Sequence, residues 1–184
     1  MLTKILIAAA VLVVLFVVLV ALRPSEFRVT RFARIAAPPE TVFLQVNDLH
    51  NWEAWSPWAK LDPAAKNSYE GPSAGVGAAF AWAGNNKIGE GRMTITDSKP
   101  YDLVRFRLDF LKPFKSTSTA EFSFQPEGDQ TLVHWTMLGE HNFISKAMSL
   151  FMNCDKMLGG YFDQGLAAMK LVAETAAQKT RKAA

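Results

Sequence analysis

Apolar residues recur at spacings of three and four along the segment Asn153–Gln178 near the C-terminus, with charged residues between them. This spacing predicts an amphipathic helix, because such residues share one face of an α-helix. The predicted apolar stripe consists of Met157, Leu158, Tyr161, Phe162, Leu166, Met169, Val172 and Ala176. A helix of about 25 residues is roughly 38 Å long, so it needs a large apolar surface to cover.

Alternating apolar and polar residues predict the strands that would supply this surface. The alternation is cleanest from Asp102 to Phe110, where apolar side chains face one way and mostly charged ones the other. The predicted strands are Glu26–Ala37, Lys66–Glu70, Val76–Ala83, Ile88–Asp97, Asp102–Phe110, Ser116–Gln125 and Thr131–Leu138.

Short helices are predicted between these strands and before the long helix. Pro38-Pro39-Glu40 opens the first, which runs to about Val46, because proline is tolerated in a first helical turn and a carboxylate is favoured there. The others are Leu49–Trp55 and Phe143–Met152. The resulting order indicates an α+β domain, in which a curved antiparallel sheet closes over the C-terminal helix.

An uninterrupted apolar run of 18 residues, Ile5–Leu22, begins the chain. At 1.5 Å per residue it is roughly 27 Å long, close to the hydrocarbon thickness of a bilayer. We interpret it as a retained single-span anchor. The alternative is a cleaved signal peptide, which typically has a shorter apolar region and a small-residue cleavage site. The chain then divides into an anchor (1–25), a globular domain (26–178) and a basic disordered tail (179–184).

Charge adds little to this picture, since the formal net charge is +3. The basic excess follows the apolar run and recurs in the tail, which favours anionic lipid headgroups over nucleic acid as a partner. Arginines after the run favour a cytoplasmic domain by the positive-inside rule. A short basic N-terminus before the run is also typical of an anchor whose domain lies outside the cell membrane. The sequence therefore does not decide on which side of the membrane the domain lies.

Several segments together resemble a known superfamily. They are Ile35–Phe43, Asn51–Trp58, Gly71–Gly77 and the pair Gly165-Leu166. The chain resembles the SRPBCC, or START-like, superfamily, and within it membrane-anchored bacterial proteins of the polyketide cyclase/dehydrase and lipid-transport family. The resemblance covers about Phe27 to Glu174 and implies a helix-grip (START/Bet v 1-like) fold in a single-pass protein, expected in the bacterial inner membrane. It carries over no catalytic motif, because the superfamily includes transporters, receptors and enzymes.

The helix-grip fold commonly holds a cavity between the sheet and the long helix. Its expected lining here, together with one histidine, is Phe80, Trp82, Met93, Phe106, Leu108, Phe122, Phe124, His134, Met157, Tyr161, Phe162 and Met169. Apolar walls with few polar groups suit a lipid-like or aromatic ligand. The alternative is that these side chains simply fill the core.

Trp52, Trp55 and Trp58 form an unusual cluster around Pro57. Tryptophan favours membrane interfaces, so this segment could enter lipid headgroups or gate a lipid entrance. Packing of the two short helices against the sheet is the alternative, and we favour it.

Two polar side chains are candidates for acid–base chemistry: His134 on a strand, and Glu140 at a corner shared with His141 and Asn142. A hydrogen-bonded structural histidine and helix capping by Asn142 are the alternatives. The histidines lack metal-ligand spacing, so no metal site is expected, and no cofactor either. Cys154 is interpreted as a small buried hydrophobe, and a lone cysteine excludes an internal disulfide.

These observations lead to three hypotheses. The first is a membrane-anchored protein, more a binder than an enzyme, that holds a hydrophobic small molecule (lipid or isoprenoid-like) between the sheet and the C-terminal helix. The second is a polyketide cyclase/dehydratase-like enzyme in which His134 or Glu140 moves protons. The third is a membrane-tethered sensor or interaction module, which would expose an apolar patch.

Overall fold

The computed structural model of the protein describes residues 1–140, 143–148, 150 and 154–183. In chain order its elements are α1 (Leu2–Ala21), β1 (Glu26–Ile35), α2 (Pro39–Asn47), the 3-10 turn η1 (Leu49–Asn51), α3 (Trp52–Trp55), β2 (Lys66–Glu70), β3 (Ala79–Ala83), β4 (Glu90–Lys99), β5 (Leu103–Lys112), β6 (Ser116–Glu127), β7 (Gln130–Glu140), α4 (Phe143–Met148) and α5 (Cys154–Ala183).

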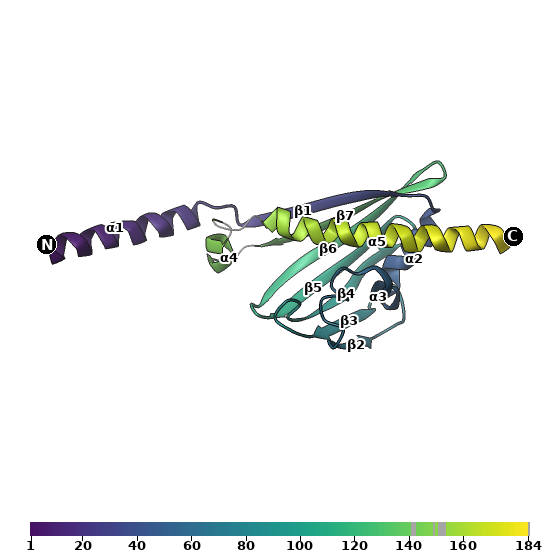
Figure 1. The fold of residues 1–184 in the computed structure, drawn as a ribbon, viewed down its shortest axis with the longest axis horizontal. Coiled ribbons are helices and arrows are strands. Elements are labelled where there is room, and N and C mark those ends of the chain that lie inside the picture. Colours follow the sequence, from purple (N-terminus) through teal and green to yellow (C-terminus); the bar gives the residue numbers. More distant parts are fainter. Residues whose placement is uncertain (141–142, 149, 151–153, 184) are drawn as a thin grey trace.

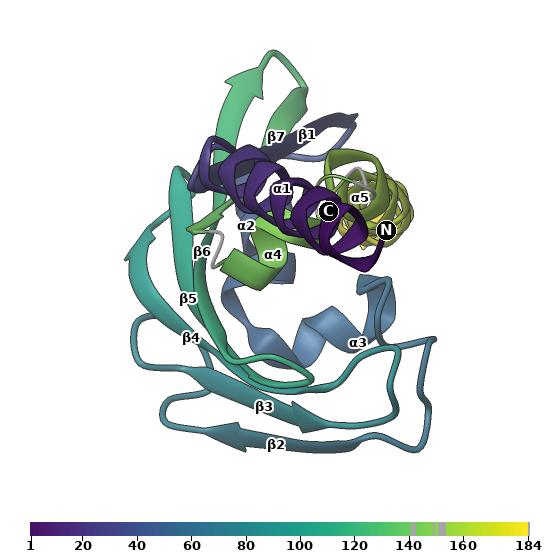
Figure 2. The same ribbon diagram turned by 90° about the vertical axis from the view of Figure 1, so that its left-hand side faces the viewer.

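The strands form one antiparallel, seven-stranded sheet in the order β1-β7-β6-β5-β4-β3-β2. The sheet is strongly curved, and α2, α3 and α5 lie on its concave side (Figure 2). α5 contacts β1, α2 and α3 and runs along β1 (Figure 1). This is the predicted helix-grip, Bet v 1-like architecture, which is therefore confirmed.

Antiparallel pairing places two groups of turns at opposite ends of the sheet. Glu26, where β1 begins, pairs with Glu140, where β7 ends, and Ser118 near the start of β6 pairs with Gly139. One end of the sheet therefore carries the exit from α1, the end of β7 and the β5–β6 turn. We call it the α1 end. The β4–β5 turn around Tyr101 lies at the opposite end, because β4 and β5 run in opposite directions between the two.

Helix α1 projects away from the domain (Figure 1). It is long and apolar enough to cross a membrane, and the same length and composition also fit a signal sequence. Within α1, Val20 in the last turn is the residue that is buried, and α1 contacts α4. The Lys146 Nζ of α4 also donates a 2.8 Å hydrogen bond to Ser25 Oγ, just beyond α1.

The strand ends agree with the sequence predictions to within two residues, except at β3. Val76 was expected in that strand, but β3 begins at Ala79 because the preceding residues form a turn. Gly75 and Gly77 have positive φ angles of 78° and 90° in this turn. The Gly75 backbone N–H donates to Asn47 O of α2, and the Gly77 N–H donates to Ile95 O of β4.

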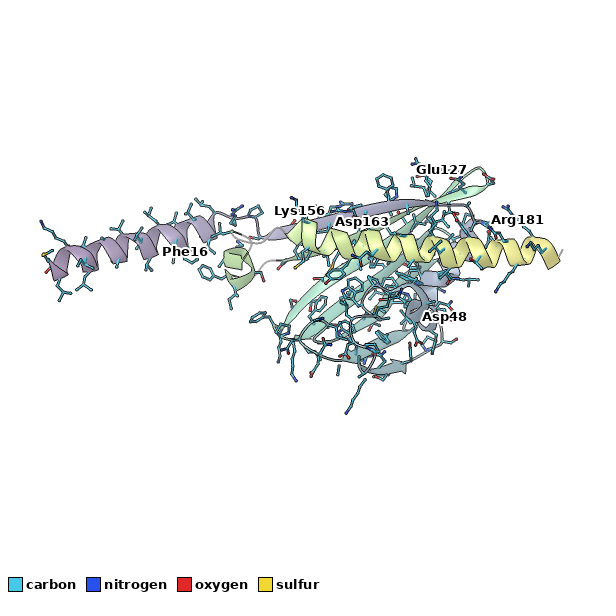
Figure 3. All side chains as sticks on the ribbon, in the orientation of Figure 1. Phe16, Asp48, Glu127, Lys156, Asp163 and Arg181 are labelled. Carbon is cyan, nitrogen blue, oxygen red and sulfur yellow. The ribbon has the colours of Figure 1, made fainter. Side chains whose placement is uncertain are left out.

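The C-terminal tail also differs from expectation. α5 continues to Ala183, so residues 179–183 are helical where a disordered tail was expected. The end of α5 lies at the opposite extreme of the molecule from α1, with Arg181 near its tip (Figure 3). The basic residues of this tail are thus far from those that follow α1. The predicted end of the preceding helix at Met152, and Asn153, lie outside the described residues.

Candidate functional site

The strand residues predicted to bind a ligand share the concave face of the sheet, with the exception of His134. Strand register aligns them in rows across the strands. One row is Val104, Phe122 and Trp135; the next is Ile95, Phe106, Ala120 and Met137; a third is Phe80, Met93, Leu108 and Ser118. The rows differ in burial, and this difference locates the site.

The rows beneath the middle of α5 are filled by aromatic rings. Phe162 of α5 stacks on Trp135, with ring centroids 4.1 Å apart and planes within 6°. Phe122 also stacks on Trp135, with ring centroids 4.7 Å apart. Trp58 contacts Trp135 edge-on, with ring centroids 5.7 Å apart. Phe122, Phe162 and Met169 are fully buried. These side chains therefore form core, and the core-packing alternative holds for this part of the predicted lining.

The tryptophan cluster belongs to the same core. Trp52 and Trp55 are buried, and their indole N–H groups donate 2.9 Å hydrogen bonds to Val46 O and Gln45 O of α2. Each ring is amphipathic, and here the polar edge is satisfied inside the protein. Trp52 and Trp55 therefore pack the short helices against the sheet and do not reach a membrane.

Toward the α1 end, the concave face is only partly covered. Five apolar side chains there are half-buried against the core, and we call them the open apolar surface: Phe27, Phe80, Trp82, Leu108 and Phe110. Gly91 is required in this surface, since a Cβ at that position would lie 2.5 Å from the Trp82 ring. The Trp82 indole occupies the space that a side chain at Gly91 would need, and its N–H donates to Ile88 O at 3.0 Å.

A polar group borders the open apolar surface at the β2 edge. Tyr69 pairs with Phe80 across the sheet, and their ring centroids are 5.2 Å apart. His50 stacks on Tyr69 at 4.1 Å, and its Nδ1 lies 2.9 Å from the Asp48 carboxylate. Partial burial, and next the negative charge of Glu53, raises the pKa of Tyr69. Its hydroxyl therefore stays protonated as a donor at neutral pH. No local sequence pattern indicates this group, because His50 and Tyr69 are distant along the chain.

The two predicted acid–base residues do not reach the concave face. His134 lies on the opposite side of β7 from Trp135 and packs against the exposed ring of Phe32, 5.9 Å away. Glu140, six residues further along β7, lies on the same side of the strand as His134 and is exposed. Residues alternate between the two faces of a strand, so both predictions of a cavity acid or base are wrong in position. His141, Asn142 and the side chain of Cys154 lie outside the described residues.

The predicted lining residues on α5 differ in how deeply they are buried. Phe162 and Met169 are core residues, and Tyr161 is half-buried beside Trp58, with ring centroids 6.0 Å apart. Met157 is half-exposed, so it does not belong to the buried interface.

An ionic clamp fixes the start of α5 to β1. The Arg31 guanidinium donates to both carboxylate oxygens of Asp155, at 3.1 and 3.0 Å, and lies 3.5 Å from Asp163. The hydrogen bonds to Arg31 lower the pKa of Asp155, and the same bonds raise the pKa of Arg31. Gly159 makes room for the guanidinium, since a Cβ there would overlap it. Arg31 is thus neutralised by the protein itself and serves packing.

Two further features do not add to the site. A depression of about 290 Å³, widely open to solvent, lies at the edge formed by β2, β3 and β4 and includes Trp82 and Leu111 among its lining. Among the described residues, no group of three or more His, Cys, Asp or Glu side chains is arranged to hold a metal ion. The chemistry available on the concave face is therefore apolar contact, bordered by Tyr69 and His50.

Comparison with known proteins agrees with this geometry. The family model described as "Polyketide cyclase / dehydrase and lipid transport" matches residues 26–174. No curated protein matches the chain.

Solved structures share the fold at low sequence identity. Protein CV1439 from Chromobacterium violaceum aligns with a TM-score of 0.58 and 14% identity, over 83% of this chain and 99% of its own. The di-domain ARO/CYC StfQ from the steffimycin biosynthetic pathway gives 0.61 and 12%, over 84% and 52%. Ara h 8.0201 gives 0.53 and 9%, over 84% and 99%. Because the family model matches residues 26–174, which are more than half of the chain, the chain belongs to the polyketide cyclase/dehydrase and lipid transport family of the SRPBCC superfamily.

Proposed function

We propose that this protein is a single-pass membrane protein whose helix-grip domain binds a hydrophobic small molecule, such as a lipid or an isoprenoid-like compound, on the open apolar surface. The observation that carries the proposal is the uneven burial of the concave face. Its middle is solid core, whereas Phe80, Trp82 and Leu108 toward the α1 end stay partly exposed. Aromatic and aliphatic walls with few polar groups suit an apolar guest.

The membrane assignment is supported by α1. Its 20 residues correspond to roughly 30 Å of helix, which is the thickness of a bilayer core. Retention of α1 is tested by finding the protein in the membrane fraction after alkaline carbonate extraction, with an intact N-terminus by mass spectrometry. A mature chain that begins after Ala21 and is released by carbonate would instead identify a signal peptide.

Ligand binding is tested by filling the open apolar surface without making it polar. Leu108→Trp adds bulk at the centre of this surface, between Met93 and Ser118. Phe32→Trp is the matched control, because Phe32 is exposed on the outer face of the sheet. The full chain is purified in lipid nanodiscs, and its small molecules are extracted and identified by mass spectrometry.

We expect a hydrophobic compound that co-purifies equally with the wild type and with Phe32→Trp, and that falls at least several-fold in Leu108→Trp. Near-ultraviolet circular dichroism verifies that both variants remain folded. If no compound depends on Leu108, the proposed binding site is refuted.

A cyclase/dehydratase-like reaction is the second candidate, and one observation favours it. The Asp48–His50 pair, stacked on Tyr69 beside Phe80, places an acid–base group next to the open apolar surface. A catalytic role predicts that His50→Gln retains a compound different from that held by the wild type: an isomer if the step is a ring closure, or a compound heavier by one water if the step includes dehydration. Identical compounds in both proteins would exclude turnover that depends on His50.

A further inference from the structure

The α1 end of the domain exposes apolar side chains on two elements that are far apart in sequence. Leu111 near the end of β5 is 50% exposed, and Phe114 in the β5–β6 turn is 56% exposed. In α4, Phe143 is 52% and Ile144 is 54% exposed. Single exposed apolar residues need no explanation, but a group gathered at one end of a molecule marks an interaction surface.

Both elements lie at the end of the domain that would face the membrane if α1 spans it. The β5–β6 turn lies at the α1 end of the sheet, because Ser118, just after this turn, pairs with Gly139 near the end of β7. α4 contacts α1 and lies beside its C-terminal end, with the β5–β6 turn at the same end of the domain (Figure 1). If α1 spans the bilayer, its last turn at Val20 is near the membrane surface, and α4 is held at that level.

The charge of the turn matches a negatively charged bilayer. The end of β5 and the turn have the sequence Leu111-Lys112-Pro113-Phe114-Lys115, and no acidic residue occurs from Lys112 to Ala120. Lys112 pairs with Glu90 at 2.7 Å, whereas Lys115 is exposed next to Phe114. An aromatic ring between two lysines fits the headgroup region, where rings enter the interface and cations meet anionic lipids.

We propose that the β5–β6 turn and α4 form a second membrane contact, which enters the headgroup region of the anionic bilayer that α1 spans. This inference rests on the proposed retention of α1 as an anchor. The contact holds the α1 end of the domain against the bilayer. The open apolar surface lies at that same end, so a lipid passes between the bilayer and the protein without crossing bulk water.

Lipid-attached quenchers test the contact in the full-length protein. Single cysteines replace Phe114 or Ile144 in a Cys154→Ser background and are labelled with the fluorophore NBD. Tyr101→Cys is the matched control, because Tyr101 is an aromatic residue of similar exposure (47%) at the opposite end of the sheet. The proteins are reconstituted in vesicles of phosphatidylcholine and phosphatidylglycerol that carry nitroxide labels near the headgroups.

We expect quenching at positions 114 and 144 to exceed that at position 101 several-fold. Equal, weak quenching at all three positions would overturn the contact, and so would a blue-shifted but unquenched signal at position 114, which would show that a second protein covers this surface. Carbonate extraction of the same vesicles separates the two ideas. A resistant, unquenched protein refutes only the second contact, whereas an extracted protein refutes the anchor. Ligand binding is measured independently of both.

Discussion

Replacing Phe162 by alanine should release the long helix from the sheet. The Phe162 side chain is 1% exposed and stacks on Trp135 at 4.1 Å with an interplanar angle of 6°. A buried phenylalanine hides roughly 150–250 Å², which corresponds to about 4–6 kcal/mol at 25 cal/mol per Å² as an upper bound. Measured Phe→Ala substitutions in cores cost about 3–5 kcal/mol, since neighbouring side chains relax into part of the cavity.

We therefore expect Phe162→Ala to lower the free energy of unfolding by about 4 kcal/mol, a roughly thousandfold change in the unfolding equilibrium. This is a large part of the 5–15 kcal/mol typical of a domain. The measurement is guanidinium denaturation of the full chain in non-ionic micelles, followed by tryptophan fluorescence and by near-ultraviolet circular dichroism.

The matched control is Leu171→Ala on the same helix. Leu171 is 69% exposed, so its substitution should change the free energy of unfolding by no more than about 0.5 kcal/mol. A loss below about 1 kcal/mol for Phe162→Ala would refute the reasoning, because it would mean that α5 is not held to the sheet through this stack.

Three further predictions concern the core and the clamp. Trp52→Phe removes the donor to Val46 O and should cost about 1–3 kcal/mol in the same denaturation assay; an unchanged midpoint would contradict a structural role for this hydrogen bond. Gly159→Ala displaces the Arg31 guanidinium, so its effect on the unfolding temperature should not add to that of Asp155→Asn, whereas additive effects would rule out a shared clamp. The pKa of Asp155 is lowered in the folded protein from the ordinary value of 3.8, so its stabilisation is complete above pH 3.8 and is lost as the pH falls through the folded-state pKa. Asp155→Asn should therefore flatten the stability curve below pH 3.8, and an unchanged acid limb would refute this account.

The type and order of the elements follow from local patterns in the chain. The period of α5 and the alternation along β5 are local properties, because each depends on which neighbouring side chains share a face. Element ends were predicted less well where glycine backbone geometry intervened, as at Gly75 before β3. The helical end of α5 was also missed, because charge and exposure do not by themselves prevent a helix from continuing.

Which residues contact one another depends on how the elements pack in three dimensions. His134 and Trp135 are adjacent in sequence, yet one faces outward and the other forms the centre of the core, since a strand alternates its faces and only packing determines which face is covered. Likewise, Asp48, His50 and Tyr69 come together only because the chain folds back at the β2 edge. The division of the concave face into solid core and open apolar surface depends on where α5 crosses the sheet, and no local pattern encodes that crossing.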